Sequence, residues 1–391
     1  MDMRPGFKQS DVGAIPEDWD ARRLGTIGRV VRGGSPRPAG DPRYFDGSFI
    51  PWLTVAALTN IPDHELEVTR TFGHLTEEGS KHSRTLASGT LIIANSGATL
   101  GIAKILGITC CANDGITAIE AQRDSSKAFV AYCINAQTTR LREVVASGNG
   151  QPNLNTSLIA NIAIPFPPLV EQKAIAAALS DVDALLGALD RLIAKKRDLK
   201  QAAMQQLLTG QTRLPGFSGK WETKRLGNFS PLQRGFDLPN PELRPGPFPV
   251  VYSNGILNHH TQFQVRGPGV VTGRSGTIGK VVFVEDDYWP HNTSLWVTSF
   301  RGNNPKFVYY VLKSVGLDRF ASGSGVPTLN RNDVHAYAVT VPSSIEEQDA
   351  IVAALTDIDA ELTALEQRRD KTRLLKQGMM QELLTGRTRL V

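Results

Sequence analysis

Cysteines and long apolar runs are scarce in this sequence. Its three cysteines, the adjacent Cys110 and Cys111 and the distant Cys133, form neither a disulfide framework nor a zinc-binding spacing. No apolar run reaches the roughly 18 residues that a membrane-spanning helix needs. Residues 1–20 lack the basic-then-apolar order of a signal peptide. We therefore expect a soluble, reduced, cytoplasmic protein.

Motifs for catalysis are missing as well. An amino-group methyltransferase needs an Asn/Asp-Pro-Pro-aromatic loop, and the nearest string, at 304–307, lacks the second proline. The Gly-rich string at 276–280 has the wrong spacing for a phosphate-binding loop, which favours a tight turn. His259 and His260 are adjacent and would point apart on a strand, so they do not predict a metal site. We expect no catalytic residue and no metal site.

The composition is that of a globular protein with a mildly basic balance. Hydrophobic residues make up 41% and charged residues 21% of 391 residues, and the net charge is +5. This length suggests two or three domains. The balance permits a polyanionic partner such as nucleic acid without requiring one.

A long internal repeat organises the chain. Residues 171–214 align without gaps on residues 347–390 at a constant offset of 176, and 27 of the 44 positions are identical. Such self-similarity indicates a duplicated structural unit. The repeat continues more faintly in two further pairs of segments: 147–155 with 322–330, and 18–25 with 220–227. The layout is a variable block and a constant segment, twice.

Each constant segment is predicted to form one long helix. Apolar residues recur at alternating steps of four and three, the spacing of a coiled-coil seam. These residues are Ile175, Leu179, Val182, Leu186 and Leu189 in the first copy and Ile351, Leu355, Ile358, Leu362 and Leu365 in the second. Because a whole domain separates the two helices in the sequence, antiparallel pairing is favoured. The alternative is two independent helices, each packed on its own domain.

Local signals mark the helix ends. Ser344 and Glu347 have the spacing of a capping box, and Pro168 fits the first turn of the first copy. Gly210 and Gly386 are expected to end the two helices.

The variable blocks mix strand and helix patterns. Strands are predicted at 89–97, 116–122, 269–276 and 280–286, and helices at 129–145 and 307–320. The predicted fold class is α+β: two globular mixed α/β domains, separated by two long helices that pair as an antiparallel coiled coil, with internal pseudo-twofold symmetry. The predicted parts are 1–166 and 213–342 for the domains, and 167–212 and 343–391 for the helices.

Several motifs occur in duplicated order. Each helix starts with Glu-Gln, continues with D-x-D and ends with LLTG-x-TRL. Further motifs are W-x-x-x-R-L-G (19–25 and 221–227), I-P-W-L (50–53), S-G-T-I-G-K-V (275–281), and S-G-x-G-x-P-x-L-N before each helix. With this order the whole chain resembles the specificity (S, or HsdS) subunit of type I restriction-modification systems.

The resemblance implies that the variable blocks are target recognition domains, each reading one half of a split double-stranded DNA site. It implies that the helices form a spacer that docks two modification (M) subunits, with restriction (R) subunits joining the complex. The chain would be non-catalytic and hold no cofactor. S-adenosylmethionine would bind the M subunits of this adenine methyltransferase and restriction complex, and ATP and Mg²⁺ the R subunits.

The candidate DNA-binding residues are polar side chains in loops and at strand ends, since Arg suits guanine or phosphate and Asn or Gln suits adenine. They are Arg32, Arg37, Arg43, Asn60 and Asn95 in the first block, and Gln233, Arg234, Asn254, His259, His260, Arg274, His291 and Asn292 in the second. Because the blocks differ in sequence, we expect unlike half-sites, about one helical turn apart. Two alternatives are a self-sufficient modification enzyme, which the missing motifs disfavour, and a coiled-coil scaffold whose variable domains bind protein partners.

Overall fold

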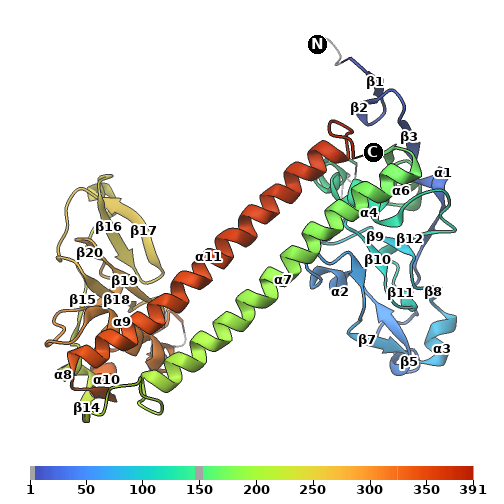
Figure 1. The fold of residues 1–391 in the computed structure, drawn as a ribbon. Coiled ribbons are helices and arrows are strands. Elements are labelled where there is room, and N and C mark those ends of the chain that lie inside the picture. Colours follow the sequence, from blue (N-terminus) through green and yellow to red (C-terminus); the bar gives the residue numbers. More distant parts are fainter. Residues whose placement is uncertain (1–4, 146–152, 324, 391) are drawn as a thin grey trace. The chain divides into compact units, whose positions relative to one another are not determined.

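The structure is a computed structural model and describes residues 5–145, 153–323 and 325–390. The chain divides into two compact units, residues 1–191 with 366–391, and residues 192–365. The division passes through both long helices. Each unit therefore contains one variable block and half of each helix (Figure 1).

The globular part of the first unit is built from two main sheets. One has the strand order β4-β12-β9-β10-β6 and the other β7-β5-β11-β8, while β3 pairs with β13 and β1 with β2. The strands are β1 (Phe7–Ser10), β2 (Gly13–Pro16), β3 (Asp20–Arg23), β4 (Arg29–Arg32), β5 (Phe45–Leu53), β6 (Glu67–Val68), β7 (Gly73–Leu75), β8 (Arg84–Leu86), β9 (Leu91–Ala94), β10 (Ala103–Leu106), β11 (Cys110–Ala112), β12 (Ile116–Glu120) and β13 (Ala163–Phe166). The helices are α1 (Leu24–Ile27), α2 (Val55–Thr59), α3 (Glu77–Lys81), α4 (Lys127–Asn135), α5 (Thr138–Arg140), a π-helical turn (Leu141–Val145) and α6 (Thr156–Ala160).

The globular part of the second unit is smaller but similarly organised. Its sheets have the orders β15-β21-β18-β19 and β17-β16-β20, while β14 pairs with β24 and β22 with β23. The strands are β14 (Trp221–Arg225), β15 (Leu232–Arg234), β16 (Phe248–Tyr252), β17 (Gly255–His260), β18 (Gly269–Gly273), β19 (Val281–Val284), β20 (Trp289–Pro290), β21 (Ser294–Val297), β22 (Ala321–Ser322), β23 (Thr328–Leu329) and β24 (Ala338–Pro342). The helices are α8 (Leu226–Phe229), α9 (Pro305–Val315), α10 (Arg331–Ala336) and two 3₁₀ turns (Asn240–Glu242 and Leu317–Phe320).

The two globular parts share one framework. The antiparallel order β4-β12-β9-β10 of the first has its counterpart in β15-β21-β18-β19 of the second. In the other sheet, β5 pairs with β7 antiparallel and with β11 parallel, and β16 pairs in the same two ways with β17 and β20. The duplication therefore extends through the variable blocks, including the part between the two faint sequence matches.

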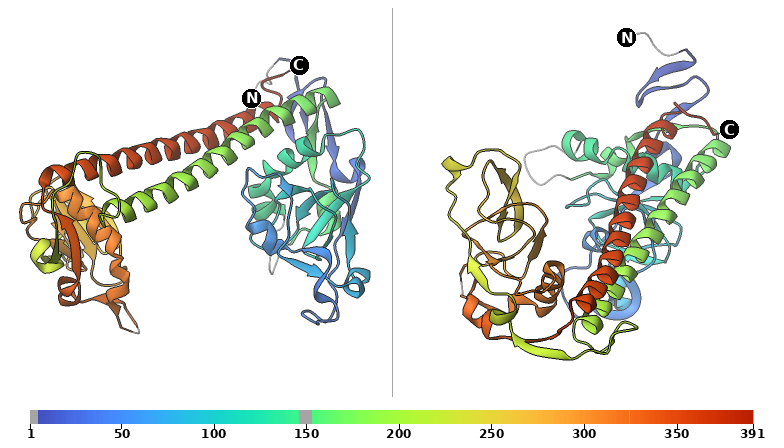
Figure 2. Two further views of the ribbon diagram at one scale, coloured as in Figure 1. Left: turned by 60° about the horizontal axis from the view of Figure 1, so that its bottom comes forward. Right: turned by 60° about the vertical axis from the view of Figure 1, so that its left-hand side comes forward.

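The two constant segments form long helices, as predicted. α7 (Leu169–Leu207) and α11 (Ile345–Leu383) have 39 residues each, and their bounds differ by the offset of the repeat. In each unit, half of α7 lies alongside half of α11 in the opposite direction (Figures 1 and 2). The ion pairs Asp183–Lys376 and Asp190–Arg369 show this in the first unit, and Lys196–Glu361 and Lys200–Asp359 in the second.

The predicted seam is buried to different degrees along its length. The buried members are Ile175, Leu179, Leu186, Leu189, Ile351, Leu355 and Leu362, whereas Val182, Ile358 and Leu365 are half-buried. Ile175 and Leu179 belong to one core with Phe129 of the first domain and Leu383 of the other helix. The second unit repeats this arrangement, with Ile351 and Leu355 beside Phe307 and Leu207. Each helix thus packs both on its own domain and on the other helix.

The predicted helix ends need one correction. Gly210 and Gly386 follow the helices with φ of 73° and 69°, conformations that suit glycine. The Ser344 hydroxyl accepts a hydrogen bond from the backbone N–H of Glu347 (3.3 Å). The Glu347 side chain does not complete the capping box, because its carboxylate accepts hydrogen bonds from Arg213 instead.

A buried lysine fastens a loop of the first domain. Lys104 on β10 is 2% exposed, and its ammonium donates to the carbonyl oxygens of Pro62 (2.8 Å) and Glu65 (2.5 Å). Burial lowers the pKa of Lys104 from 10.5 to about 8, against the opposing charge of Asp63. The ammonium therefore titrates at lower pH in the folded protein than in the unfolded chain.

This difference predicts a pH dependence of stability. Between pH 8 and 10.5 the unfolded chain binds more protons at Lys104 than the folded protein does. The free energy of unfolding should therefore rise with pH between pH 8 and 10.5, by up to about 3 kcal/mol. Below pH 8 the charged Lys104 ammonium destabilises the folded protein by this full amount. Urea unfolding measures the free energy of unfolding of the wild type and of Lys104→Met. As the pH rises, the wild type should gain stability relative to Lys104→Met. A difference that stays constant would contradict the assignment.

Candidate nucleic-acid interface

In the first domain, polar side chains from three loops meet around Asp114. Asp114 lies in the turn before β12, and its carboxylate accepts from the Ser35 hydroxyl (2.7 Å) and lies 3.4 Å from the Arg37 guanidinium. Its backbone carbonyl accepts from Arg32 Nε (2.6 Å) and Asn95 Nδ2 (3.1 Å). Two predicted arginines are therefore held at one place by an acidic residue that the sequence analysis did not select.

A similar group forms in the second domain. Arg274 Nη1 donates to the carbonyl oxygen of Asn292 (3.2 Å), and Asn292 Nδ2 donates to the carboxylate of Asp237. The same carboxylate lies 3.4 Å from Arg234. The His291 ring lies against the Tyr252 ring, with centroids 4.4 Å apart, and burial lowers its pKa. Four of the eight residues predicted for this domain thus lie together.

The two groups occupy equivalent places in the shared framework. Equivalent backbone hydrogen bonds place Asn95 with Arg274 and Asp114 with Asn292. The three matched pairs of bonds are Gly33 N→Ile116 O (2.8 Å) with Gly235 N→Ser294 O (3.1 Å), Asn95 N→Gly115 O (2.9 Å) with Arg274 N→Thr293 O (2.9 Å), and Leu154 N→Asn95 O (2.8 Å) with Leu329 N→Arg274 O (2.8 Å). The same pattern of backbone hydrogen bonds therefore supports two different sets of side chains.

Glycine is required beside both groups. A Cβ on Gly33 would lie 2.1 Å from the carbonyl oxygen of Asn113, and one on Gly235 would lie 2.3 Å from that of His291. Backbone atoms cannot give way as a flexible side chain does, so alanine at either position must displace the neighbouring turn. At Gly34 the nearest atoms are 3.8 Å away.

Gly33→Ala is therefore expected to destabilise the first domain by about 1–3 kcal/mol and to disturb the Asp114 loop, whereas Gly34→Ala should change stability by less. Thermal unfolding of the two variants measures this difference. If both variants unfold at the same temperature as the wild type, the close contact between Gly33 and the carbonyl oxygen of Asn113 is wrong.

Most of the other predicted residues are exposed but belong to other local structures. Asn60 ends α2, where its Nδ2 donates to the carbonyl of Ala56 (3.3 Å). Gln233, Asn254 and His259 are exposed in the second unit. Asn95 and His260 are 1% and 5% exposed and are bonded to neighbouring loops. Asn95 donates to the carbonyl oxygen of Asp114 (3.1 Å), and His260 accepts from the Arg244 N–H (3.1 Å). DNA contact by these two residues stays a prediction.

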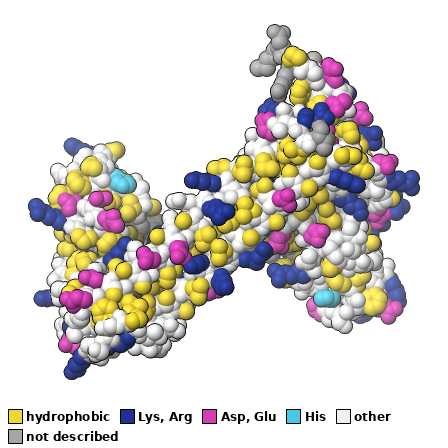
Figure 3. Space-filling model, viewed as in Figure 1, with side chains coloured by type: hydrophobic (Ala, Val, Ile, Leu, Met, Phe, Trp, Pro, Cys, Tyr) yellow, Lys and Arg dark blue, Asp and Glu magenta, His cyan; other side chains and the backbone are white. Residues whose placement is uncertain are grey.

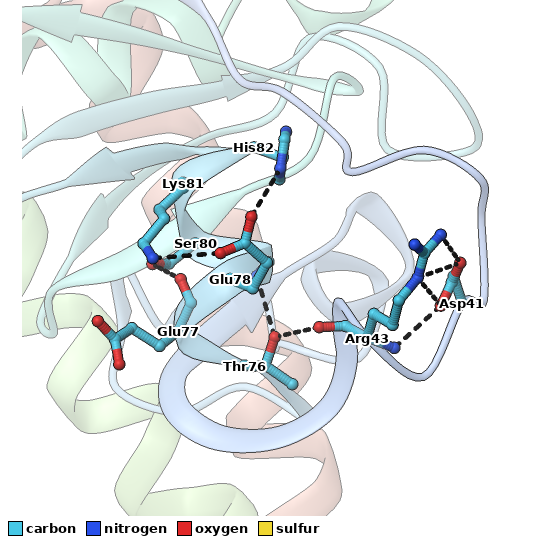
Figure 4. Close-up of polar contacts among 9 residues, drawn as sticks. Asp41, Arg43, Thr76, Glu77, Glu78, Ser80, Lys81 and His82 are labelled. Carbon is cyan, nitrogen blue, oxygen red and sulfur yellow. Dashed lines mark hydrogen bonds and ion pairs between the residues drawn. The ribbon is translucent and has the colours of Figure 1, made fainter.

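Arg43 lies in a separate polar group of the first domain, shown in Figure 4. Its guanidinium forms an ion pair with Asp41 (2.7 Å), and its carbonyl accepts from the Thr76 hydroxyl (2.6 Å). Thr76 also caps α3, where Glu78 holds Lys81 at 3.1 Å. Arg43 is thus exposed but already charge-paired.

The Gly-rich motifs before the helices adjoin these groups. Residues 147–152 of the first motif lie outside the described residues. Asn155 and Asn330 close the two motifs, and each caps the following short helix: Asn155 Oδ1 accepts from Leu158 N (2.8 Å) and Asn330 Oδ1 from Asn332 N (3.0 Å). Both asparagines therefore serve as helix caps.

The long helices leave apolar side chains exposed. Leu199 is 50% and its repeat equivalent Leu375 is 58% exposed, and Leu374 beside it is 68% exposed. Figure 3 shows hydrophobic side chains among Lys and Arg along the visible face of the helices. Leu199 and Leu375 occupy the same position of the repeat, so the two copies present similar exposed apolar surface there.

None of the helices in the part of the chain that the structure describes is long and apolar enough to cross a membrane. Within the same residues, no group of three or more His, Cys, Asp or Glu side chains could hold a metal ion.

Comparison with known proteins places these features in a family. The family model of the type I restriction modification DNA specificity domain matches residues 16–195 and again 218–375. The chain is 25% identical over 255 residues to the type I restriction enzyme MjaIX specificity subunit of Methanocaldococcus jannaschii, which covers 61% of this chain and 57% of that protein, just over half of it. It is 22% identical over 432 residues to the putative MjaX specificity subunit of the same organism, covering 98% and 97%.

Solved structures agree on the fold. The S subunit of a type I restriction-modification system from M. genitalium is similar with a TM-score of 0.63 at 17% identity, covering 98% of this chain and 99% of that one. A chain from a study of assembly and conformational transition of the type I system has a TM-score of 0.61 at 17% identity, covering 95% and 99%. The two family matches include both variable domains and most of both helices. The chain therefore belongs to the family of type I restriction-modification specificity subunits, which recognise DNA targets.

Proposed function

We propose that each variable domain binds one half of an asymmetric, bipartite DNA site. The observation that carries this proposal is the pair of polar groups around Asp114 and Asn292, built on one backbone construction with different side chains. Arginine and asparagine are residues that contact phosphates and base edges. A repeated framework with unlike side chains suits two half-sites of different sequence.

In this proposal α7 and α11 form a continuous antiparallel coiled coil that sets the distance between the half-sites. A helix of 39 residues is roughly 58 Å long at 1.5 Å per residue, and half-sites one turn apart are about 34 Å from centre to centre. The ion pairs between the helices in each unit support the antiparallel direction.

The helices would also dock two M subunits. Leu199 and Leu375 are exposed at equivalent positions of the repeat, so two copies of one partner could bind in the same way. The chain itself would be non-catalytic and without a cofactor. S-adenosylmethionine would bind the M subunits, and ATP and Mg²⁺ would bind R subunits that join the complex. A cytoplasmic location fits the free, buried cysteines.

One experiment tests the proposal. The chain is co-expressed with its M subunit, and methylated sites are mapped in the host genome while the purified complex selects from a random DNA pool. We expect one motif of two unlike halves with an unspecified gap. A continuous or palindromic motif would contradict the bipartite site, and the absence of any DNA selection would favour the scaffold alternative. Native mass spectrometry should show two M subunits per chain, and one at saturation would contradict the repeated docking surface.

A further inference from the structure

Two kinds of position occur in the equivalent polar groups. Arg32 and Arg234 are the same residue at the same place, at the end of β4 and of β15, and each is followed by the required glycine. Asp114 and Asn292 also occupy the same place but differ. A contact common to both half-sites, such as one to the DNA backbone, suits the identical pair. A contact that distinguishes the half-sites suits the unlike pair.

Asp114 has the chemistry of an acceptor only. Its side chain is 41% exposed, so its carboxylate can meet a ligand. The Ser35 hydroxyl at 2.7 Å holds Oδ1, and Arg37 at 3.4 Å balances the charge near Oδ2. An ionised carboxylate has about four lone-pair sites, so these two partners leave acceptor capacity. In the major groove it can accept only from an exocyclic amino group, N4 of cytosine or N6 of adenine, and it repels the acceptors of guanine and the O4 of thymine.

Asn292 has both functions of an amide. Asp237 accepts a hydrogen bond from its Nδ2, which fixes the orientation of the amide. A second N–H and the carbonyl oxygen remain for a ligand. A donor and an acceptor side by side match N7 and N6 of adenine.

We propose that residues 114 and 292 are the equivalent base-reading positions of the two half-sites, Asp114 accepting from the amino group of a base and Asn292 pairing with adenine, while Arg32 and Arg234 hold the DNA backbone. This assignment rests on the proposed function of the two domains. The family match covers most of both domains and does not single out residue 114 or residue 292.

The test uses the complete complex with M subunits and compares methylated-site motifs of the wild type, Asp114→Asn and Asn292→Asp. Asp114→Asn should change the base preference at one position of the first half-site at least tenfold and leave the second half-site as it was. Asn292→Asp should do the reverse. Ser35→Ala, which loosens the carboxylate without removing it, should relax the same position that Asp114→Asn alters.

Glu78→Gln is the control. Glu78 also pairs with a cation on the surface of the first domain, Lys81 (3.1 Å), but it lies in the separate group of Figure 4. It should leave both half-sites unchanged. Arg32→Ala and Arg234→Ala should weaken binding to all sequences alike and reduce its salt dependence.

The outcomes separate the inference from the function beneath it. If the wild type yields no bipartite motif, the proposed function fails. If the wild type yields one but Asp114→Asn weakens binding without changing any base preference, Asp114 serves only to hold Arg37, and the inference is overturned. Circular dichroism melting of each variant verifies that the protein is folded. If Asp114→Asn does not fold, the base preference of Ser35→Ala tests the inference instead.

Discussion

Glu171→Ala is expected to destabilise the first unit by about 2–4 kcal/mol, because it removes a buried carboxylate that accepts several hydrogen bonds and leaves Arg389 with only the exposed Asp18 (2.8 Å) as counter-charge. The Glu171 side chain is 1% exposed. Its carboxylate accepts from Trp19 Nε1 (3.0 Å) and from Arg389 at Nε (2.5 Å) and Nη2 (2.8 Å). These bonds join the first domain, the start of α7 and the segment after α11 in a single group.

The repeat supplies a twin of this group in the second unit. Glu347 is 2% exposed and accepts from Arg213 at Nε (2.9 Å) and Nη2 (2.5 Å), and from Trp221 Nε1 (3.3 Å). Glu347→Ala should therefore destabilise the second unit in the same way. The two losses should be similar in size. Trp19 is fully buried whereas Trp221 is half-buried, but Arg389 keeps the Asp18 carboxylate (2.8 Å) as a partner when Glu171 is removed.

Hydrogen exchange measured separately for the two units is the decisive experiment. Glu171→Ala should lower protection in residues 5–145 before those of the second unit, and Glu347→Ala should do the opposite. Glu17→Ala, which removes an exposed carboxylate two residues before Trp19, is the control and should change little. An effect of Glu171→Ala below about 1 kcal/mol would mean that the buried pair contributes no more than a surface one.

The features that the two copies share were predictable from the sequence. The helices begin two residues before the Glu-Gln pair and end at equivalent leucines, because the apolar spacing and Gly210 and Gly386 recur in both copies. Strand β12 lies within the predicted range 116–122. Helix α9 overlaps the predicted range 307–320 but begins two residues earlier, at Pro305, and ends where Gly316 adopts a left-handed conformation. Identical residues in two places indicate identical packing, and this inference needs no tertiary information.

The polar groups were only partly predictable. The equivalence between Asn95 and Arg274 depends on backbone hydrogen bonds, which do not require particular side chains and therefore cannot be inferred from the sequence. Asp114 did not stand out in the sequence because an acidic residue repels a polyanion, and its contacts with Ser35 and Arg37 are visible only in the structure. A weak signal existed: Arg-Gly follows a strand in both blocks, and Ser-Gly follows the strand ending near Asn95 and Arg274.

Asp183→Ala is the second substitution with a large expected effect, about 3 kcal/mol in the first unit. The Tyr132 hydroxyl donates to Asp183 Oδ2 (2.8 Å), and Lys376 Nζ lies 2.6 Å from Oδ1 and 5.3 Å from the Tyr132 ring centroid. Burial raises the pKa of Tyr132, so its hydroxyl remains a donor. Removal of the carboxylate leaves the ammonium of Lys376, whose side chain is 15% exposed, without the Asp183 counter-charge.

The repeat again supplies the matched comparison. In the second unit Tyr310 donates to Asp359 (2.8 Å), and Lys200 forms the ion pair. The Asp359 side chain is 35% exposed against 6% for Asp183, so solvent can replace more of what Asp359→Ala removes, and its cost should be smaller. A double-mutant cycle of Asp183→Ala with Lys376→Met should show coupling above 1 kcal/mol, since the pair lies in contact.

These pairs also bear on the proposed spacing of the half-sites. Buried polar contacts between helices fix register, because a shifted helix would leave both charges unpaired in an apolar seam. The double variant Asp183→Ala/Lys376→Met removes both charges, so it should recover stability while permitting other registers. In the methylated-site motif this relaxation would appear as sites with longer or shorter gaps and unchanged half-sites. A single gap length in the double variant would show that packing of the two domains on the helices, rather than the buried pair, sets the register.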